Sequence, residues 1–202
     1  MLYTKRPTAK HPFARFYLLV IGAMLCLAAP NTAHAQVPTP LFGPQNALTQ
    51  SIINPRAVYA TDLNGDGFAD VLSASSGDNK IAWYQNDGTG NFGEQQIITT
   101  NVDGVITVYA TDLDNDGDAD VLSASITDDK IAWYQNDGAG NFGTQQIITT
   151  NADYAQSIYA TDLDSDGDAD VLSASAGDNK IAWYHNNGTG NFGTQQIITT
   201  NA

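Results

Sequence analysis

The chain has 202 residues, a formal charge of −14 and a single cysteine, Cys26. A charge this negative argues against binding to nucleic acids and to anionic membrane surfaces, both of which attract Lys and Arg. The cysteine lies in an apolar run near the N-terminus, so disulfides are not expected to stabilise the rest of the chain.

The first 35 residues are typical of a secretory signal peptide. They contain four basic residues and no acidic one, then a fourteen-residue apolar run at 16–29, then Ala-His-Ala at 33–35 as a small-x-small cleavage site. A membrane anchor is the alternative, but a span needs about 20 apolar residues. We therefore expect cleavage before Gln36, a secreted, periplasmic or cell-surface location, and no membrane insertion afterwards.

Removal of residues 1–35 makes the chain more acidic. Residues 36–202 keep all 22 acidic residues but only four basic ones, which gives a formal charge of −18. Residues 36–41 form a short lead segment that contains proline. A cysteine-free chain in an oxidising compartment needs another source of stability, and bound cations would supply one.

From residue 42 onward the sequence repeats with a period of fifty residues. The three clearest copies occupy about 56–101, 106–151 and 156–201. Residues 109–150 and 159–200 are identical at 35 of 42 positions. A fixed period in this range indicates a stacked or circular repeat architecture.

Each copy predicts four short strands. In the first copy they are rich in β-branched and aromatic residues and lie at 56–61, 69–75, 80–85 and 95–100. Gly, Asn and Asp fill the turns between them. Four short strands in about 50 residues is the size of one propeller blade. We therefore predict an all-β fold of β-propeller-type, four-stranded blades.

The repeat array predicts a partial propeller of three blades and one orphan strand. Residues 42–50 are in phase with the fourth strand of a copy that lacks its first three strands. The last copy already has its own fourth strand, and three blades fall below the four to eight of typical propellers. We expect the N-terminal part of a longer protein. The alternatives are an open arc, or a ring closed by self-association if the chain ends at Ala202.

An acidic loop stands between the first two predicted strands of every copy. Its spacing, D-x-[DN]-x-D-G-x-x-D, suits calcium, because oxygens at positions 1, 3, 5 and 9 and the carbonyl of position 7 can converge around a glycine turn. No Lys or Arg lies within these loops. The expected ligands are Asp62, Asn64, Asp66, the Phe68 carbonyl and Asp70; Asp112, Asp114, Asp116, the Asp118 carbonyl and Asp120; and Asp162, Asp164, Asp166, the Asp168 carbonyl and Asp170.

Other kinds of acidic loop fit less well. An EF-hand or a dockerin-like loop needs an acid at position 12 and helical flanks, whereas these loops have Ser73, Ser123 and Ser173 there and strand-like flanks. A merely solvated acidic turn remains an alternative, although three copies with one spacing argue against it. The first loop has an amide, Asn64, where the others have a carboxylate, so we expect it to bind calcium most weakly.

These loops, together with the turn N-D-G-T-G-N-F-G at 86–93 and its copies at Asn136 and Asn186, resemble the FG-GAP/VCBS repeat family. That family includes the repeats in the N-terminal propeller of integrin α-subunits. The resemblance covers nearly all of 41–202 and implies a calcium-stabilised β-propeller, with the metal loop joining the first two strands of each blade. Family members are extracellular modules for adhesion or for ligand or glycan binding, often attached to other domains. The chain departs from the family in its low blade number.

One tryptophan per copy stands at the same strand position, at Trp83, Trp133 and Trp183, and each is followed by a tyrosine. The tryptophans could form a sugar-binding platform, but the regular placement favours packing between blades. The tyrosines face the other side of the strand and are candidates for exposure. In the turn at 86–93 and its second copy, Asp87 and Asp137 are interpreted as turn formers.

Catalysis has little support in the sequence, and we expect no enzyme. His185 is the one histidine after residue 35, and the sister copies have glutamine at its position. Motifs of serine hydrolases and zinc proteases are absent, as is a cysteine nucleophile. The leading hypothesis is a secreted, calcium-binding module for protein interaction or adhesion, in which calcium is structural. The alternatives are a non-catalytic carbohydrate-binding propeller, or the propeller part of a larger secreted polysaccharide-degrading enzyme.

Overall fold

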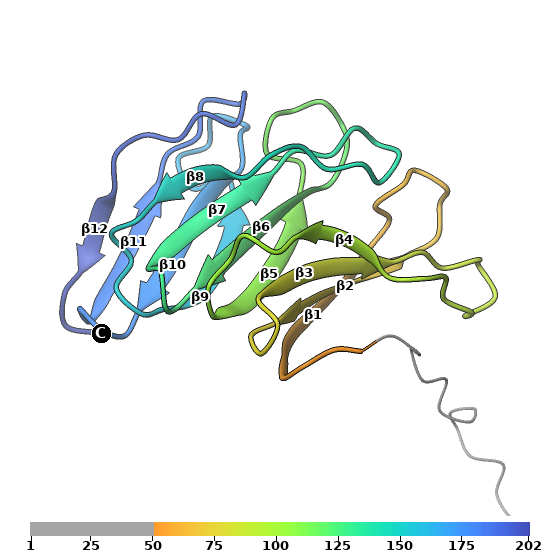
Figure 1. Cartoon of the computed structure of the whole chain (residues 1–202). Coiled ribbons are helices and arrows are strands. Elements are labelled where there is room, and N and C mark those ends of the chain that lie inside the picture. Colours follow the sequence, from red (N-terminus) through yellow and green to blue (C-terminus); the bar gives the residue numbers. More distant parts are fainter. Residues whose placement is uncertain (1–50) are drawn as a thin grey trace, which may run out of the picture. The chain divides into compact units, whose positions relative to one another are not determined.

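Twelve β-strands and no helix make up residues 51–202, which are the residues that this computed structural model describes (Figure 1). The strands are β1 (Pro55–Thr61), β2 (Asp70–Ser75), β3 (Lys80–Tyr84), β4 (Gln96–Thr99), β5 (Val105–Thr111), β6 (Asp120–Ser125), β7 (Lys130–Tyr134), β8 (Gln146–Thr149), β9 (Ala155–Thr161), β10 (Asp170–Ser175), β11 (Lys180–Tyr184) and β12 (Gln196–Thr199). The expected signal peptide, lead segment and orphan strand lie outside the described residues. From Ser51 onward, no helix is long and apolar enough to cross a membrane.

Each fifty-residue repeat forms one antiparallel sheet of four strands in chain order. We call β1–β4 blade 1, β5–β8 blade 2 and β9–β12 blade 3. The register repeats as well, since Tyr59 pairs with Leu72, Tyr109 with Leu122, and Tyr159 with Leu172. The prediction of an all-β fold with four-stranded blades is confirmed, and the strands of the first copy lie within one residue of their predicted bounds.

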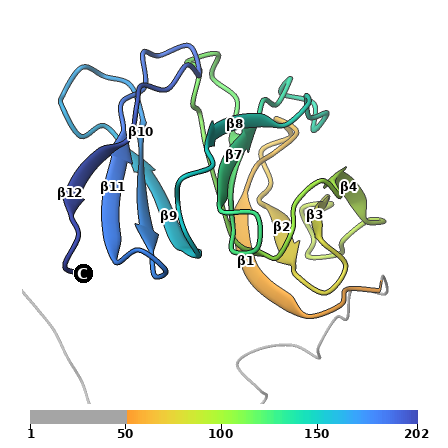
Figure 2. The same ribbon diagram turned by 60° about the vertical axis from the view of Figure 1, so that its left-hand side comes forward.

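The three sheets lie side by side and form an open array, as expected for part of a propeller (Figures 1 and 2). The first strands β1, β5 and β9 contact one another in succession. Their tyrosines Tyr59, Tyr109 and Tyr159 contact one another in succession, with ring centroids 4.9 and 5.1 Å apart and ring planes tilted by 54° and 53°. Burial, followed by the neighbouring Tyr59 hydroxyl, raises the pKa of Tyr109 to about 12. The first strands of neighbouring blades are therefore in contact along the array.

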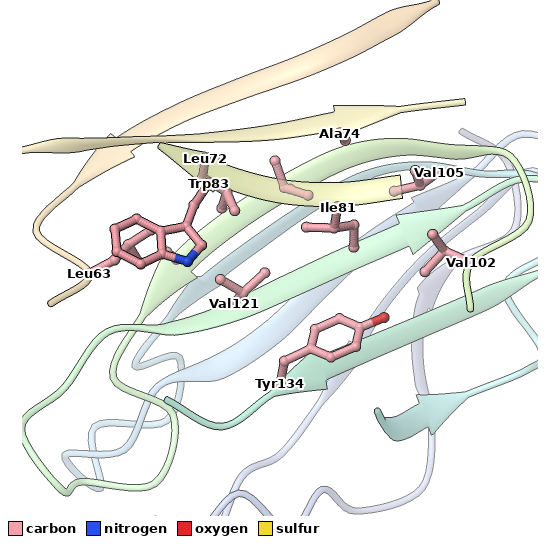
Figure 3. Packing of buried hydrophobic residues seen from close by; sticks show 11 residues of the cluster. Leu63, Leu72, Ala74, Ile81, Trp83, Val102, Val105, Val121 and Tyr134 are labelled. Carbon is pink, nitrogen blue, oxygen red and sulfur yellow. The ribbon is translucent and has the colours of Figure 1, made fainter. Parts of the chain in front are cut away.

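The core lies between consecutive blades rather than within one blade (Figure 3). The face of blade 1 that packs on blade 2, here called its trailing face, contributes Leu63, Leu72, Ala74, Ile81 and Trp83. The opposing leading face of blade 2 contributes Val102, Val105, Val108, Ala110, Val121 and Tyr134. The same set, fifty residues later, packs blade 2 against blade 3. Every blade therefore offers two apolar faces.

Of the two aromatic positions of the third strand, the tryptophan agrees with its prediction and the tyrosine does not. Trp83 and Trp133 are 2% and 3% exposed between blades, so packing was the right interpretation for both. Tyr84, Tyr134 and Tyr184 are fully buried, so the expectation that they are exposed was wrong. For Tyr134 and Tyr184 the reason is that alternation along a strand separates two faces, and in a stack of sheets both faces can be covered.

Candidate metal centre

The acidic loops join the first and second strand of each blade, at 62–69, 112–119 and 162–169. We call them loops 1, 2 and 3 and number their positions from the first aspartate, with the ninth residue opening the next strand. The glycine at position 6 has φ of 87°, 96° and 99° at Gly67, Gly117 and Gly167, a left-handed conformation that favours glycine. The predicted sharp turn is therefore present in all three loops.

The aspartate at position 1 holds the turn closed. Its two carboxylate oxygens accept hydrogen bonds from the backbone N–H groups of positions 4 and 6. In loop 1, Asp62 accepts from Gly65 at 2.8 Å and from Gly67 at 2.7 Å. Asp112 and Asp162 make the same pair of bonds at 2.7 to 3.1 Å. The position 1 carboxylate is thus held in place by backbone hydrogen bonds that do not depend on a bound ion.

The aspartate at position 9 is fully buried in all three blades, at Asp70, Asp120 and Asp170. One oxygen accepts the N–H of position 2, at 2.9 to 3.1 Å. The other accepts the N–H of the asparagine that follows the third strand, at 2.8 Å in each case. Burial raises the pKa of Asp70, and it raises the pKa of Asp120, in the middle blade, to about 7.

Loops 2 and 3 bring three of the predicted ligand positions together. In loop 2, oxygens of Asp112, Asp114 and Asp120 all lie within 4.8 Å of one another. Loop 3 repeats this grouping of positions 1, 3 and 9. Burial, followed by the charge of Asp116, raises the pKa of Asp114. A set of carboxylate oxygens at this spacing fits calcium, which takes six to eight oxygen ligands.

Loop 1 differs at position 3. The Asn64 Nδ2 donates to the Asp66 carboxylate at 3.0 Å, and the Asn64 Oδ1 accepts the Asp66 N–H at 3.2 Å. Among residues 51–202, the groups of three or more His, Cys, Asp or Glu side chains that could hold a metal ion lie in loop 2, in loop 3, and between loop 3 and His185. Loop 1 therefore presents a smaller negative charge at the same backbone geometry.

Positions 5 and 7 have other contacts. Asp66, Asp116 and Asp166 at position 5 are exposed, and each accepts the N–H of position 7 at 2.9 to 3.0 Å. The position 7 residues, expected to contribute a carbonyl, pack their side chains on a glycine of the turn after the third strand. The pairs are Phe68 with Gly88, Asp118 with Gly138, and Asp168 with Gly188. The two turns of a blade are thus held against each other.

Lysines do not neutralise the loops. Each lysine pairs instead with an aspartate of the turn between the second and third strands, at 2.8, 2.8 and 2.6 Å for Lys80, Lys130 and Lys180. Within the described residues, His185 is the basic side chain that contacts a loop carboxylate, at 3.3 Å from Asp164 and 3.2 Å from Asp166. The negative charge of loops 1 and 2 thus has no side-chain counter-ion in this part of the chain.

Sequence reasoning missed the residue that directly follows the third strand and reaches over each loop. The Gln85 Nε2 donates to Asp66 at 3.1 Å, and the Gln135 Nε2 donates to Asp114 at 2.6 Å. In blade 3 this position is His185, which forms a group with Asp164 and Asp166. The sequence signal was weak, because only the fixed spacing in the repeat sets these residues apart from other surface residues.

The asparagines after the third strand were also missed as contacts between blades. In blade 2, the Asn136 Nδ2 donates to the Ala119 carbonyl at 3.0 Å and to the Leu63 carbonyl of loop 1 at 2.8 Å. Asn186 makes the same two bonds to Ala169 and to Leu113 of loop 2. Both asparagines are 1% exposed. Each loop is thus hydrogen-bonded to the next blade, through residues 73 positions apart.

Two local interpretations agree with the structure. Ser73, Ser123 and Ser173 lie inside strands β2, β6 and β10, so the loops have strand flanks and no EF-hand acid at position 12. In the second turn, an Asp87 oxygen accepts from the Thr89 N–H at 2.8 Å, and Asp137 accepts from the Ala139 N–H at 3.0 Å. Both aspartates are therefore engaged in forming their turns.

Comparison with known proteins agrees with this geometry. The model of the FG-GAP-like repeat matches residues 62–123, 112–173 and 162–202. Curated protein sequences gave no match. Among solved structures, the fold is similar to a lectin of Agrocybe aegerita, described for specific recognition of non-reducing terminal N-acetylglucosamine. The TM-score is 0.55 and the identity 22%, over 71% of this chain and 38% of the lectin chain. The chain thus spans well under half of that lectin's length.

Proposed function

The chain belongs to the FG-GAP-like repeat family, and from this membership we propose that it is a secreted, calcium-binding module of β-propeller type for protein interaction or adhesion. The observation that carries the calcium proposal is the grouping of positions 1, 3 and 9 in loops 2 and 3, with carboxylate oxygens within 4.8 Å of one another. The absence of a Lys or Arg partner at these loops, among residues 51–202, supports it further.

Calcium in this proposal is structural. Bound at a loop, it supplies the positive charge that the carboxylates of positions 1, 3 and 9 lack. The buried Asp120 links its loop to the backbone of Asn136, and the Asn136 side chain continues to the Leu63 carbonyl of blade 1. A filled loop would therefore order both its own hairpin and the contact between two blades.

Protein binding is favoured by an exposed apolar side chain on the outermost strand of every blade. Ile97, Ile147 and Ile197 are 59%, 55% and 55% exposed. The exposed fraction is nearly the same in all three blades. It is therefore not caused by a missing neighbouring blade, and packing between blades does not account for an apolar residue at this position. One apolar residue per blade along the outer strands offers a partner a regularly spaced surface.

The calcium proposal is tested by exchanging the position 3 residue between loops and measuring calcium binding by titration calorimetry. Fewer ligand charges attract the ion less, so Asp114→Asn is expected to weaken binding at loop 2 several-fold. The reverse change, Asn64→Asp, is expected to strengthen binding at loop 1 by a similar factor. Wild-type sites are expected near the 10⁻⁴–10⁻³ M of extracellular modules.

Two outcomes of the calorimetry would count against the calcium proposal. The first is that millimolar calcium gives no binding heat with the wild-type protein. The second is that Asn64→Asp and Asp114→Asn leave the titration unchanged. Magnesium at the same concentration is the control for a purely electrostatic effect, because magnesium demands a tighter octahedral site.

Glycan binding is the second candidate function. An open pocket of about 500 Å³ lies beside loop 2 and combines polar side chains with one aromatic ring: Asp116, Gln135, Asn136, Asp137, Asn141 and Phe142. The lectin of similar fold makes terminal N-acetylglucosamine the first sugar to test. Glycan-array binding that is lost in Phe142→Leu, with an unchanged melting temperature, would favour this function, and an array without signal would exclude it for the sugars tested.

A further inference from the structure

One position beside the acidic loops differs in chemistry between blades that are otherwise almost identical. The residue that directly follows the third strand is Gln85 in blade 1, Gln135 in blade 2 and His185 in blade 3. In each blade its side chain reaches a loop carboxylate at position 3 or 5. An amide nitrogen can only donate to such a carboxylate, whereas an imidazole nitrogen is also a metal ligand. Blade 3 therefore places a nitrogen ligand among loop oxygens.

The His185 Nε2 atom lies almost equally far from two carboxylates of loop 3. Its distance is 3.3 Å to Asp164 Oδ2 and 3.2 Å to Asp166 Oδ2. Both distances exceed the roughly 2.7–2.9 Å of a charged N–H···O bond, and a single N–H cannot point at both oxygens. Around a tetrahedral zinc ion with bonds of about 2.0–2.2 Å, neighbouring ligand atoms are about 3.3–3.6 Å apart. The two spacings thus resemble the edges of a metal coordination shell.

The three side chains are held in this arrangement by the blade itself. The other oxygen of each carboxylate is engaged by the loop backbone, since Asp164 Oδ1 accepts the Asp166 N–H at 3.3 Å and Asp166 Oδ1 accepts the Asp168 N–H at 2.9 Å. The imidazole directly follows strand β11 and lies edge-on to the Trp183 ring, with centroids 6.2 Å apart. One ligand atom from each of the three side chains lies within 4.8 Å of the other two. The ligands are therefore oriented before an ion binds.

Solvent access to this group does not depend on a neighbouring blade. Gln135 and Asp116, the equivalents of His185 and Asp166, are exposed although blade 2 is packed on both faces. The side chains of His185, Asp164 and Asp166 are 39%, 37% and 36% exposed. An ion can therefore reach the three ligand atoms and keep water in its shell.

The donor atoms of this group select against calcium. Calcium takes oxygen ligands, whereas imidazole suits zinc, copper and nickel. Two carboxylates and one neutral imidazole carry two negative charges, which a divalent ion balances. Loop 3 also contains the oxygen group of Asp162, Asp164 and Asp170, so Asp164 belongs to both groups. The nitrogen of His185 is what distinguishes the second group from the first.

We propose that Asp164, Asp166 and His185 bind zinc or a chemically similar transition-metal ion, in addition to the calcium groups of the loops. Water would complete the shell, as it does in zinc sites with three protein ligands. Within residues 51–202 this site belongs to blade 3, because blades 1 and 2 have glutamine at the histidine position. The proposal does not rest on calcium binding, since it requires no ion at positions 1 and 9. One blade of the module would thus respond to a different metal from the other two.

Zinc titration calorimetry of the full chain, without a histidine tag and without calcium, tests the proposal. His185→Gln is the central variant, because it introduces the residue that blades 1 and 2 carry naturally. The wild-type protein is expected to bind one zinc ion more per chain than His185→Gln. This difference is the measured quantity, because residues 1–35 contain two further histidines and a cysteine. Melting temperatures in chelator are expected to be equal, so that a loss of zinc binding reports the ligand and not the fold.

Blade 2 offers a test in which the site is gained. It already has aspartates at positions 3 and 5, Asp114 and Asp116, and the Gln135 side chain already reaches Asp114 at 2.6 Å. Gln135→His is therefore expected to add one bound zinc ion per chain. Gln85→His is the matched control and is expected to add none, because blade 1 has the amide Asn64 at position 3.

Cobalt(II) reports the geometry of the site directly. It replaces zinc in tetrahedral sites, where its visible absorption is far stronger than that of the octahedral aqueous ion. The wild-type protein and Gln135→His are expected to develop this absorption, and His185→Gln is not. Equal zinc binding by the wild-type protein and His185→Gln would overturn the proposal, and so would a Gln135→His chain that binds no additional zinc. Since these titrations contain no calcium, their failure is distinct from a failure of the calcium proposal.

Discussion

Removal of calcium is expected to lower the melting temperature of this protein by about 6 to 20 °C. A ligand that binds only the folded state stabilises it by RT ln(1 + [L]/Kd), about 1.4 to 2.7 kcal/mol per site at 10 to 100 times Kd. With Kd values near 10⁻⁴–10⁻³ M, 10 mM calcium reaches that range. Loops 2 and 3 together would then contribute about 3 to 5 kcal/mol. In a chain of this size each kcal/mol shifts the melting temperature by about 2 to 4 °C.

The measurement compares thermal unfolding in 10 mM calcium, in 10 mM magnesium and in excess chelator at constant ionic strength. A chain with Asp114→Asn and Asp164→Asn is the control, because it keeps every backbone contact of positions 1 and 9 while losing one carboxylate from each of the two loops. With calcium binding weakened several-fold at each loop, its calcium-dependent shift is expected to fall by about a third to a half. Equal melting temperatures for the wild-type protein in calcium and in chelator would rule out structural calcium.

The second large effect is expected in the core between blades 2 and 3. Leu122 is fully buried there, and Leu122→Ala is expected to cost about 2 to 5 kcal/mol of unfolding free energy, the range for leucine truncations in packed cores. Leu172→Ala removes the same atoms at the same position of blade 3, where the side chain is only half-buried. It is therefore expected to cost clearly less.

Both leucine variants are measured by denaturant unfolding in calcium, at a protein concentration low enough to keep the chain monomeric. Leu72→Ala is the further control, since Leu72 is fully buried between blades 1 and 2. Its cost should resemble that of Leu122→Ala. Similar costs for Leu172→Ala and Leu122→Ala in the monomer would show that the stability does not come from packing between blades.

Much of the fold could be predicted because the repeat gives the same evidence three times. The period of fifty, the β-rich runs and the turn residues located four strands per copy, and the structure pairs them in that order. The prediction that the tyrosines of the third strand are exposed was wrong, because alternation along a strand predicts two faces but not whether both faces are covered. Tyr134 is buried by blade 1, and its own strand contains no sign of that neighbour.

The candidate metal site was predictable within the loop and not beyond it. The spacing of aspartates located positions 1, 3 and 9, which the structure groups in loops 2 and 3. The contribution of Asn136 depends on the Leu63 carbonyl of another blade, 73 residues away. A pattern read along one repeat cannot indicate such a contact, because it arises only from the stacking of two sheets. His185 was underestimated for a different reason, since its partners Asp164 and Asp166 belong to its own blade but lie across a hairpin from it.

The near-identity of the blades has a consequence for how the chain assembles correctly. Every trailing face offers almost the same apolar set, so the faces themselves do not specify which blade docks on which. The order is imposed by the connections, which are only five residues long between β4 and β5, at residues 100–104. A short connection makes the neighbouring blade the nearest partner and leaves no reach for a more distant one. Lengthening it with a flexible insert is expected to populate misassembled chains, with blades skipped or exchanged between molecules.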